Sequence, residues 1–150
     1  MQSEIVLTPV GQVRGGRAQP QDDSWDRDIA LIELDVRFAP DALAGLTGFS
    51  HIEAVFHFDR VPPDAINTSA RHPRDRADWP LVGIFAQRGK ARPNRIGVTM
   101  CRLLSVDGLQ LKVSGLDAID GTPVLDIKPV MTGFLRAAAK SLSPNGRKNS

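Results

Sequence analysis

The chain has one cysteine, no tyrosine and few other aromatic residues, and each scarcity excludes a class of protein. Cys101 is the only cysteine in 150 residues, so no disulfide can form within the chain. It lies in the apolar run at residues 98–101, which favours a buried structural thiol over a nucleophile. Six Phe and two Trp give little support to a base-stacking platform for single-stranded nucleic acid.

Several longer patterns are also missing from the sequence. No run approaches the roughly 18 apolar residues of a membrane span, and the N-terminus has no basic-then-apolar signal, so we expect a soluble, cytoplasmic protein. There is no glycine-rich phosphate loop, no alternation of strands with helices and no G-x-S-x-G nucleophile motif. The three histidines do not have the spacing of metal ligands, so we expect no metal.

Positive charge is concentrated in one third of the chain. Residues 71–102 contain eight Lys or Arg and two Asp, a net charge of +6, whereas the whole chain carries +2 and the remainder therefore −4. A solvated loop of mixed charge would account for any single arginine. The concentration of the excess favours an anionic partner, with phosphates the obvious candidate.

Short apolar runs separated by turn residues predict an all-β fold. We expect strands at residues 4–14, 29–34, 51–58, 81–86, 96–106, 109–114 and 123–127, and short helices at 40–46 and 133–142. Asp107-Gly108 between two strands predicts a hairpin. The pattern indicates a closed or nearly closed β-barrel with long loops, as one domain over residues 1–142, followed by a disordered tail at 143–150.

Two turn-rich charged clusters are the candidate ligand loops. The first, Arg92-Pro93-Asn94-Arg95-Ile96-Gly97, combines two guanidinium groups with residues that favour a tight turn. A plain turn between strands would explain the cluster alone, but Arg88 nearby favours binding. In the second cluster, Asp117 and Asp120 precede Gly-Thr-Pro. One carboxylate could cap that turn, and the other could accept hydrogen bonds from ribose hydroxyls or an amine.

These clusters resemble the motifs of the TsaA-like (TrmO) family of tRNA methyltransferases. The family pattern G-V-F-A-T-R, R-P-N-P-I-G, L-D, D-G-T-P-V and D-I-K-P-Y corresponds here to residues 83–88, 92–97, 116–117, 120–124 and 126–130. Phe49-Ser50-His51 and Phe56-His57 match the family's F-S-H and F-H positions. The resemblance covers roughly residues 5 to 130.

The resemblance implies a β-barrel methyltransferase that uses S-adenosylmethionine and works as a homodimer, with the cofactor near the subunit interface. The implied acceptor is N6 of threonylcarbamoyl-adenosine at position 37 of tRNA. Cofactor contacts are expected from His57, Phe58, Arg88, Asn94, Met100, Leu116, Asp117, Asp120, Gly121 and Thr122. Contacts to tRNA are expected from Arg71, Arg74, Arg76, Arg92 and Arg95.

The sequence departs from the family pattern at places that bear on the acceptor. Residues 21–25 replace a Pro-Arg-Gln segment, Arg95 replaces a proline, and Val130 replaces a tyrosine. We also expect a short, single-domain member without the additional C-terminal domain of longer bacterial members. Two alternatives therefore stay open: a methyltransferase of this fold with another acceptor, and a non-catalytic module that binds an adenosyl ligand or RNA. No catalytic base is assigned, although His51 and Asp117 are conceivable.

Overall fold

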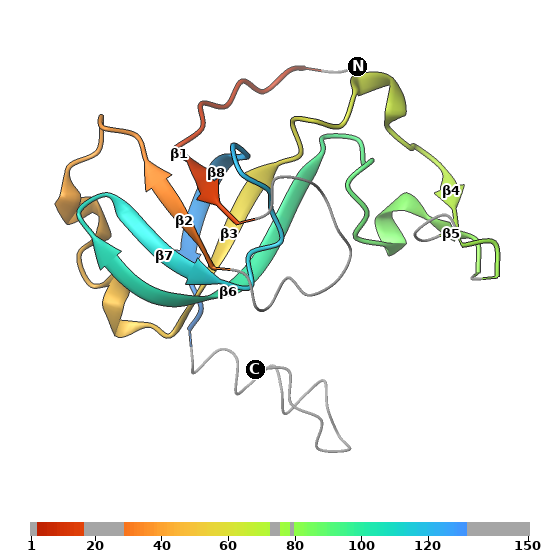
Figure 1. Ribbon diagram of the computed structural model, residues 1–150. Coiled ribbons are helices and arrows are strands. Elements are labelled where there is room, and N and C mark those ends of the chain that lie inside the picture. The colour runs from red at the N-terminus through yellow and green to blue at the C-terminus, as the bar shows by residue number, and fades with distance from the viewer. Residues whose placement is uncertain (1–2, 17–28, 73–75, 79, 132–150) are drawn as a thin grey trace.

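The protein is a closed antiparallel β-barrel with a small lobe at its side (Figure 1). The computed structural model describes residues 3–16, 29–72, 76–78 and 80–131. Six strands close the barrel in the order β1-β2-β7-β6-β3-β8. They are β1 (Gly11–Gly15), β2 (Ile29–Leu34), β3 (His51–His57), β6 (Ile96–Asp107), β7 (Gln110–Ser114) and β8 (Pro123–Pro129). The predicted all-β barrel is thereby confirmed.

Alternation of side chains along the strands fills the barrel interior. In β3, Ile52, Ala54 and Phe56 point inward and are buried, while the residues between them are half-buried on the outer face. Val13, Ile32, Leu111 and other inward-facing side chains meet them in one core cluster. A period of two is what a sheet with one buried face requires, so the apolar pattern fixes which face turns inward.

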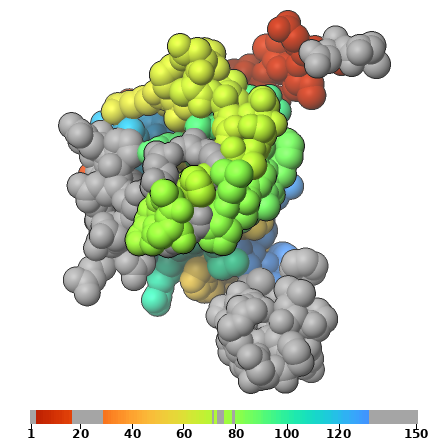
Figure 2. Space-filling model, turned by 90° about the vertical axis from the view of Figure 1, so that its right-hand side faces the viewer, coloured from red at the N-terminus to blue at the C-terminus, as the bar shows by residue number. Residues whose placement is uncertain are grey.

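The lobe consists of the described residues between β3 and β6. It contains the 3-10 turns η4 (Pro63–Ala65) and η6 (Ile84–Ala86) and a two-stranded sheet of β4 (Ala70–Arg71) with β5 (Val82–Gly83). Figure 2 shows its yellow-green and green residues in front of the barrel. The strand predicted at 81–86 is confirmed only at Val82–Gly83, because the chain then forms the η6 turn and buries Ile84.

Two further elements differ from the expectation. The first strand begins at Gly11 instead of residue 4, since Pro9 has no N–H to donate to a ladder and residues 3–9 are exposed. The helical turn or two expected at 40–46 are 3-10 turns, η2 (Pro40–Leu43) and η3 (Leu46–Gly48), with Gly45 at φ 88° before the second. Ala44 ends the first turn in a non-helical conformation, and the left-handed Gly45 precedes the second, a conformation that glycine adopts without steric cost.

The Asp107-Gly108 hairpin is confirmed, with Gly108 at φ 61° between β6 and β7. The expected helix at 133–142 and tail at 143–150 lie outside the described residues, so the single-domain boundary at 142 remains a prediction. Among the residues that are described, no helix has the length and apolar character needed to cross a membrane.

Gly11 is the position at which the barrel tolerates no side chain. A Cβ there would overlap the Glu33 carbonyl oxygen and lie 2.9 Å from Leu34 Cα, both backbone atoms of the neighbouring strand. We expect Gly11→Ala to lower the free energy of unfolding by about 1–3 kcal/mol, as overpacking does. The matched control is Gly48→Ala, whose Cβ meets nothing within 4 Å. It should stay within about 0.5 kcal/mol of the parent. Urea unfolding measures both, and equal losses in the two variants would contradict the prediction.

Candidate functional site

A pocket of about 480 Å³ lies where the lobe meets the barrel. Four stretches of chain that are distant in sequence line it: the end of β3, the start of β6, the segment from η6 to the Arg92 turn, and the loop after β7. The lining residues are Phe56, Phe58, Phe85, Ala86, Gln87, Arg88, Arg92, Ile96, Gly97, Val98, Thr99 and Asp117. Its volume falls in the range of roughly 300–1,000 Å³ that holds small-molecule ligands.

Two phenylalanine rings and a glycine form the apolar side of the pocket. The rings of Phe56 and Phe58 meet edge to face, with centroids 5.3 Å apart and an interplanar angle of 86°. They pack directly over Gly97 of β6, where an added Cβ would lie 2.7 Å from an atom of each ring. The glycine of the R-P-N-R-I-G motif is therefore required for the close approach of the two rings to the β6 backbone.

Arginine side chains of the lobe are oriented by backbone carbonyls. Arg88 NH2 donates to the Val98 carbonyl at 3.0 Å, which links the lobe to β6. Arg92 NH1 donates to the carbonyls of Gln87 and Gly89 at 2.8 and 3.2 Å. A guanidinium has five N–H donors, so both side chains can bind these carbonyls and still present N–H groups toward a ligand.

The R-P-N-R segment forms a tight turn at the rim of the pocket. The Arg95 amide donates to the Arg92 carbonyl at 2.9 Å, and Arg95 adopts φ 52°, the left-handed region that non-glycine residues seldom occupy. Its NH1 donates to the Val61 carbonyl at 2.6 Å. Among the described residues its buried Nε has no hydrogen-bond partner. Arg95 thus connects the turn to the beginning of the lobe.

The two aspartates of the second cluster have different environments. Asp120 Oδ1 accepts a hydrogen bond from the Gly15 amide at 2.8 Å, and its carbonyl accepts one from Arg60 NH2 at 3.3 Å. Its carboxylate therefore holds the turn against β1, which is the capping role that the spacing allowed. Asp117 is exposed and lines the pocket, where a ligand amine or hydroxyl can reach its carboxylate.

The structure brings together only part of the predicted cofactor set. Phe58, Arg88 and Asp117 line the pocket, and Arg92, predicted for tRNA, joins them. His57 lies between two lining residues without lining the pocket itself. The other predicted residues do not line the pocket. Asn94 is exposed in the R-P-N-R turn, Met100 is 42% exposed on β6, and Leu116 is buried in the core. Asp120 and Gly121 lie in the turn before β8, and the buried Thr122 donates to the Ile119 carbonyl at 2.7 Å.

The residues predicted for tRNA are only partly described. Arg76 is exposed and forms an ion pair with Asp78 at 3.0 Å. Arg71 lies in β4, but its side chain is outside the description, as is the whole of Arg74. His51, a conceivable base, begins β3 whereas Phe56 and Phe58 stand at its other end, about 17–23 Å along the strand. The His51 ring instead forms a hydrogen bond with the Ser50 hydroxyl, with Nδ1 and Oγ 2.8 Å apart.

Several lining residues were not predicted from the sequence. Phe85 and Gln87 belong to the G-I-F-A-Q-R stretch, and Gly97 to R-P-N-R-I-G, so both motifs marked the right segments without identifying these side chains. Phe56 belongs to the F-H match, from which only His57 and Phe58 were assigned to the cofactor, and Val98 and Thr99 had no signal that separated them from ordinary strand residues. Phe85 is 79% exposed, and a large apolar side chain in that position suits contact with a ligand or another surface.

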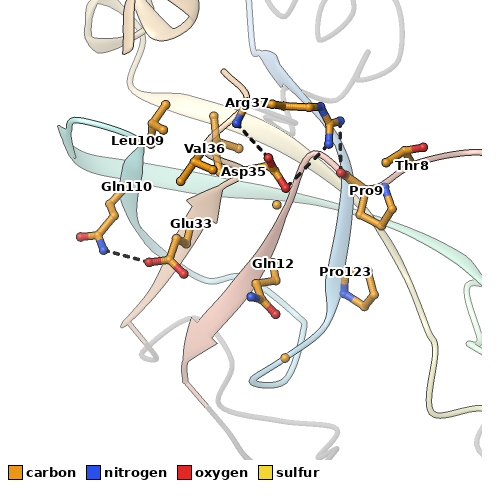
Figure 3. A pocket seen from close by; sticks show the side chains of 13 residues that line it. Thr8, Pro9, Gln12, Glu33, Asp35, Val36, Arg37, Leu109, Gln110 and Pro123 are labelled. Carbon is orange, nitrogen blue, oxygen red and sulfur yellow. Dashed lines mark hydrogen bonds and ion pairs between the residues drawn. The ribbon is translucent and has the colours of Figure 1, made fainter. Parts of the chain in front are cut away.

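A second hollow of about 720 Å³ lies on the barrel away from these residues, and of the predicted set only Gly121 lines it (Figure 3). Glu33 lies there, and its pKa is lowered because Arg14 and Gln110 donate hydrogen bonds to its carboxylate. Among the described residues, no group of three or more His, Cys, Asp or Glu could hold a metal ion. Cys101 is buried, and burial raises the pKa of its thiol to about 12, so it is not a nucleophile.

A family model for the tRNA-methyltransferase O N-terminal domain matches residues 13–134. The chain belongs to this family. A tRNA (adenine(37)-N6)-methyltransferase of Mus musculus is 36% identical over 138 residues, which are 87% of this chain and 32% of the mouse protein. The chain thus spans about a third of the length of that relative.

Shorter relatives and solved structures agree with this membership. A probable S-adenosyl-L-methionine-binding protein of Methanothermobacter thermautotrophicus is 35% identical over 84% of this chain and 90% of its own length. The crystal structure of TrmO from Pseudomonas aeruginosa is similar to this chain with a TM-score of 0.70 and 27% identity. The match covers 98% of this chain and 62% of the Pseudomonas chain.

Proposed function

We propose that the protein is a methyltransferase that uses S-adenosylmethionine and methylates N6 of threonylcarbamoyl-adenosine at position 37 of tRNA. The observation that carries the proposal is the pocket between lobe and barrel, which gathers a cation, a carboxylate and aromatic rings. The printed names of relatives, a tRNA (adenine(37)-N6)-methyltransferase and a probable S-adenosyl-L-methionine-binding protein, support the acceptor and the cofactor.

The chemistry of the lining residues fits the cofactor group by group. Arg88 can donate to the amino-acid carboxylate, and charged hydrogen bonds of this kind are among the stronger ones. Asp117 can accept from the ammonium or from ribose hydroxyls. The rings of Phe58 and Phe85 offer apolar surface to the adenine, and the buried Phe56 ring supports Phe58 from behind in an edge-to-face contact. S-adenosylmethionine supplies a methyl group already activated on a sulfonium, so the protein's contribution is chiefly positioning.

Positioning explains why no strong base is needed in the pocket. The acceptor N6 has to be held in line with the reactive methyl group, and its proton can pass to solvent late in the reaction. Asp117 is the conceivable base that lines the pocket, whereas His51 stands at the other end of β3. We assign Arg71, Arg74 and Arg76 to the tRNA backbone, and Arg92 and Arg95 to the turn at the rim of the pocket.

We also propose that the protein acts in the cytoplasm as a homodimer. Phe85 lines the pocket and is 79% exposed, and a large apolar side chain with that exposure favours contact with a partner. A cofactor site close to a two-fold interface would cover it. Binding of S-adenosylmethionine is proposed to need no metal.

Transfer of a labelled methyl group tests the proposed function. The protein is incubated with methyl-labelled S-adenosylmethionine and either total tRNA or tRNA from cells unable to make threonylcarbamoyl-adenosine. Label is expected only in tRNA that carries the modified adenosine. Equal labelling of both tRNA pools would assign a different acceptor in tRNA. Cofactor binding without any labelling would favour another acceptor or a non-catalytic module, and small-molecule acceptors would then separate these two.

Arg88→Ala should weaken binding of S-adenosylmethionine by roughly ten- to hundredfold, because a charged hydrogen bond contributes about 1.5–3 kcal/mol. Isothermal titration calorimetry measures the affinity, and circular dichroism verifies the fold. The matched control is Arg102→Ala, which removes an exposed arginine of β6 that does not line the pocket. The control should bind as the parent does. Unchanged affinity in Arg88→Ala would remove this residue from the site.

If Arg71, Arg74 and Arg76 contact tRNA phosphates, their loss should change how strongly the affinity for tRNA depends on salt. Substituting Arg71, Arg74 and Arg76 together by Ala should reduce the slope of log affinity against log salt by roughly 0.7–0.9 for each phosphate that the variant no longer neutralises. Cofactor affinity should be retained. The control triple variant replaces Arg102, Lys112 and Lys128 by Ala. These residues are exposed on barrel strands, and their substitution removes the same number of positive charges. If both triple variants lower the slope equally, the effect is net charge and the lobe is not the tRNA surface.

A further inference from the structure

An apolar arm, residues 4–8, projects from the start of the barrel. Ile5, Val6 and Leu7 are 83%, 90% and 58% exposed, three consecutive large apolar side chains in water. Figures 1 and 2 both show this red segment extending away from the body of the molecule. A run of exposed apolar residues weakens solubility unless another surface covers it. The arm therefore points to a contact beyond this chain's own barrel.

The root of the arm is held in place by the barrel. The Val10 amide donates to the Val124 carbonyl at 2.8 Å, and Arg37 NH2 donates to the Pro9 carbonyl at 3.3 Å. Pro9 fixes its own φ and biases Thr8 toward extended backbone. Ile5 can thus stand up to about 13 Å from Pro9. Ile5, Val6 and Leu7 do not line the hollow beside this root, although Thr8 and Pro9 do.

The second hollow, of about 720 Å³, lies beside that root and is called the groove below (Figure 3). Leu34, Leu109 and Pro123 supply apolar lining, and Val36 at its edge is 89% exposed. The amides of Gln12 and Gln110 lie along it. Such a surface suits an extended peptide. The apolar lining can contact the peptide's side chains, and the glutamine amides can bond its backbone N–H and C=O groups.

We propose that the arm of one copy occupies the groove of a second copy, and the reverse. This inference rests on the homodimer of the proposed function and names its contact. Thr8 and Pro9 belong to the root of the arm and also line the groove. A two-fold axis beside them would carry each arm across the other's groove, which is the reciprocal contact that such symmetry requires.

Disulfide trapping between singly substituted proteins tests the contact. Val6→Cys protein is mixed with Val36→Cys protein under mild oxidation, so that any link between the two sites must join different molecules. Cys101 stays silent because it is buried and its thiol pKa is about 12. A cross-linked dimer of the two variants is expected. The control mixture pairs Val6→Cys with Leu81→Cys, an exposed position on the lobe, and should yield at least about tenfold less. Equal yields from the two mixtures would overturn the proposal.

Sedimentation of Val6→Asp gives an independent measure. The side chain is exposed, so the variant should fold, and disruption of the arm contact should shift the protein from dimer to monomer. A variant that remains dimeric would overturn the role of the arm while leaving the homodimer intact. A parent protein that is itself monomeric would overturn both. The methyl-transfer and cofactor measurements do not depend on these outcomes, so failure of the arm contact is distinguishable from failure of the proposed activity.

Discussion

Closure of the sheet between β1 and β8 is the constraint on which the rest of the structure depends. Gly11 pairs with Val124 and Gln12 with Pro123, and the amide of Val13 donates to the Thr122 carbonyl at 2.9 Å. Gly11 has to lack a side chain there because the Glu33 backbone crosses directly above it. A closed barrel leaves no unpaired strand edge and gives the loops at its ends fixed positions. Both candidate surfaces combine strand residues with such loops.

The pocket follows from closure in two steps. The loop after β7 is held against β1 by Asp120, which leaves Asp117, three residues earlier, on the pocket. On the other side, β3 ends and β6 begins in register, so that Phe56 pairs with Gly97 and both meet the lobe. Arg88 then connects the lobe to β6 through the Val98 carbonyl. The Arg88 guanidinium and the Asp117 carboxylate thereby face one pocket although they are 29 positions apart in the sequence.

Arginines in this protein combine structural and ligand-facing roles. Arg92 and Arg95 bind carbonyls of the lobe, and these contacts hold the R-P-N-R turn in its left-handed conformation at Arg95. In the sequence these residues form one basic segment together with Arg71, Arg74 and Arg76. In the folded chain Arg92 lines the pocket, Arg95 donates to the Val61 carbonyl, and Arg76 pairs with Asp78 on an exposed part of the lobe. A basic segment in sequence is therefore divided among different surfaces.

The sequence by itself determined the barrel, because a period of two, the Asp107-Gly108 turn and the scarcity of long helix-forming runs are local properties of the chain. It also determined which segments form the pocket, since the motifs at 83–88, 92–97 and 116–117 all contribute to it. Only the tertiary structure decided which side chains face that pocket. It separated Asp117 from Asp120, left Met100 outside the pocket lining and brought Phe56 and Phe58 over Gly97. Those choices depend on strand register, barrel closure and the path of the lobe, which arise from contacts between residues far apart in the chain.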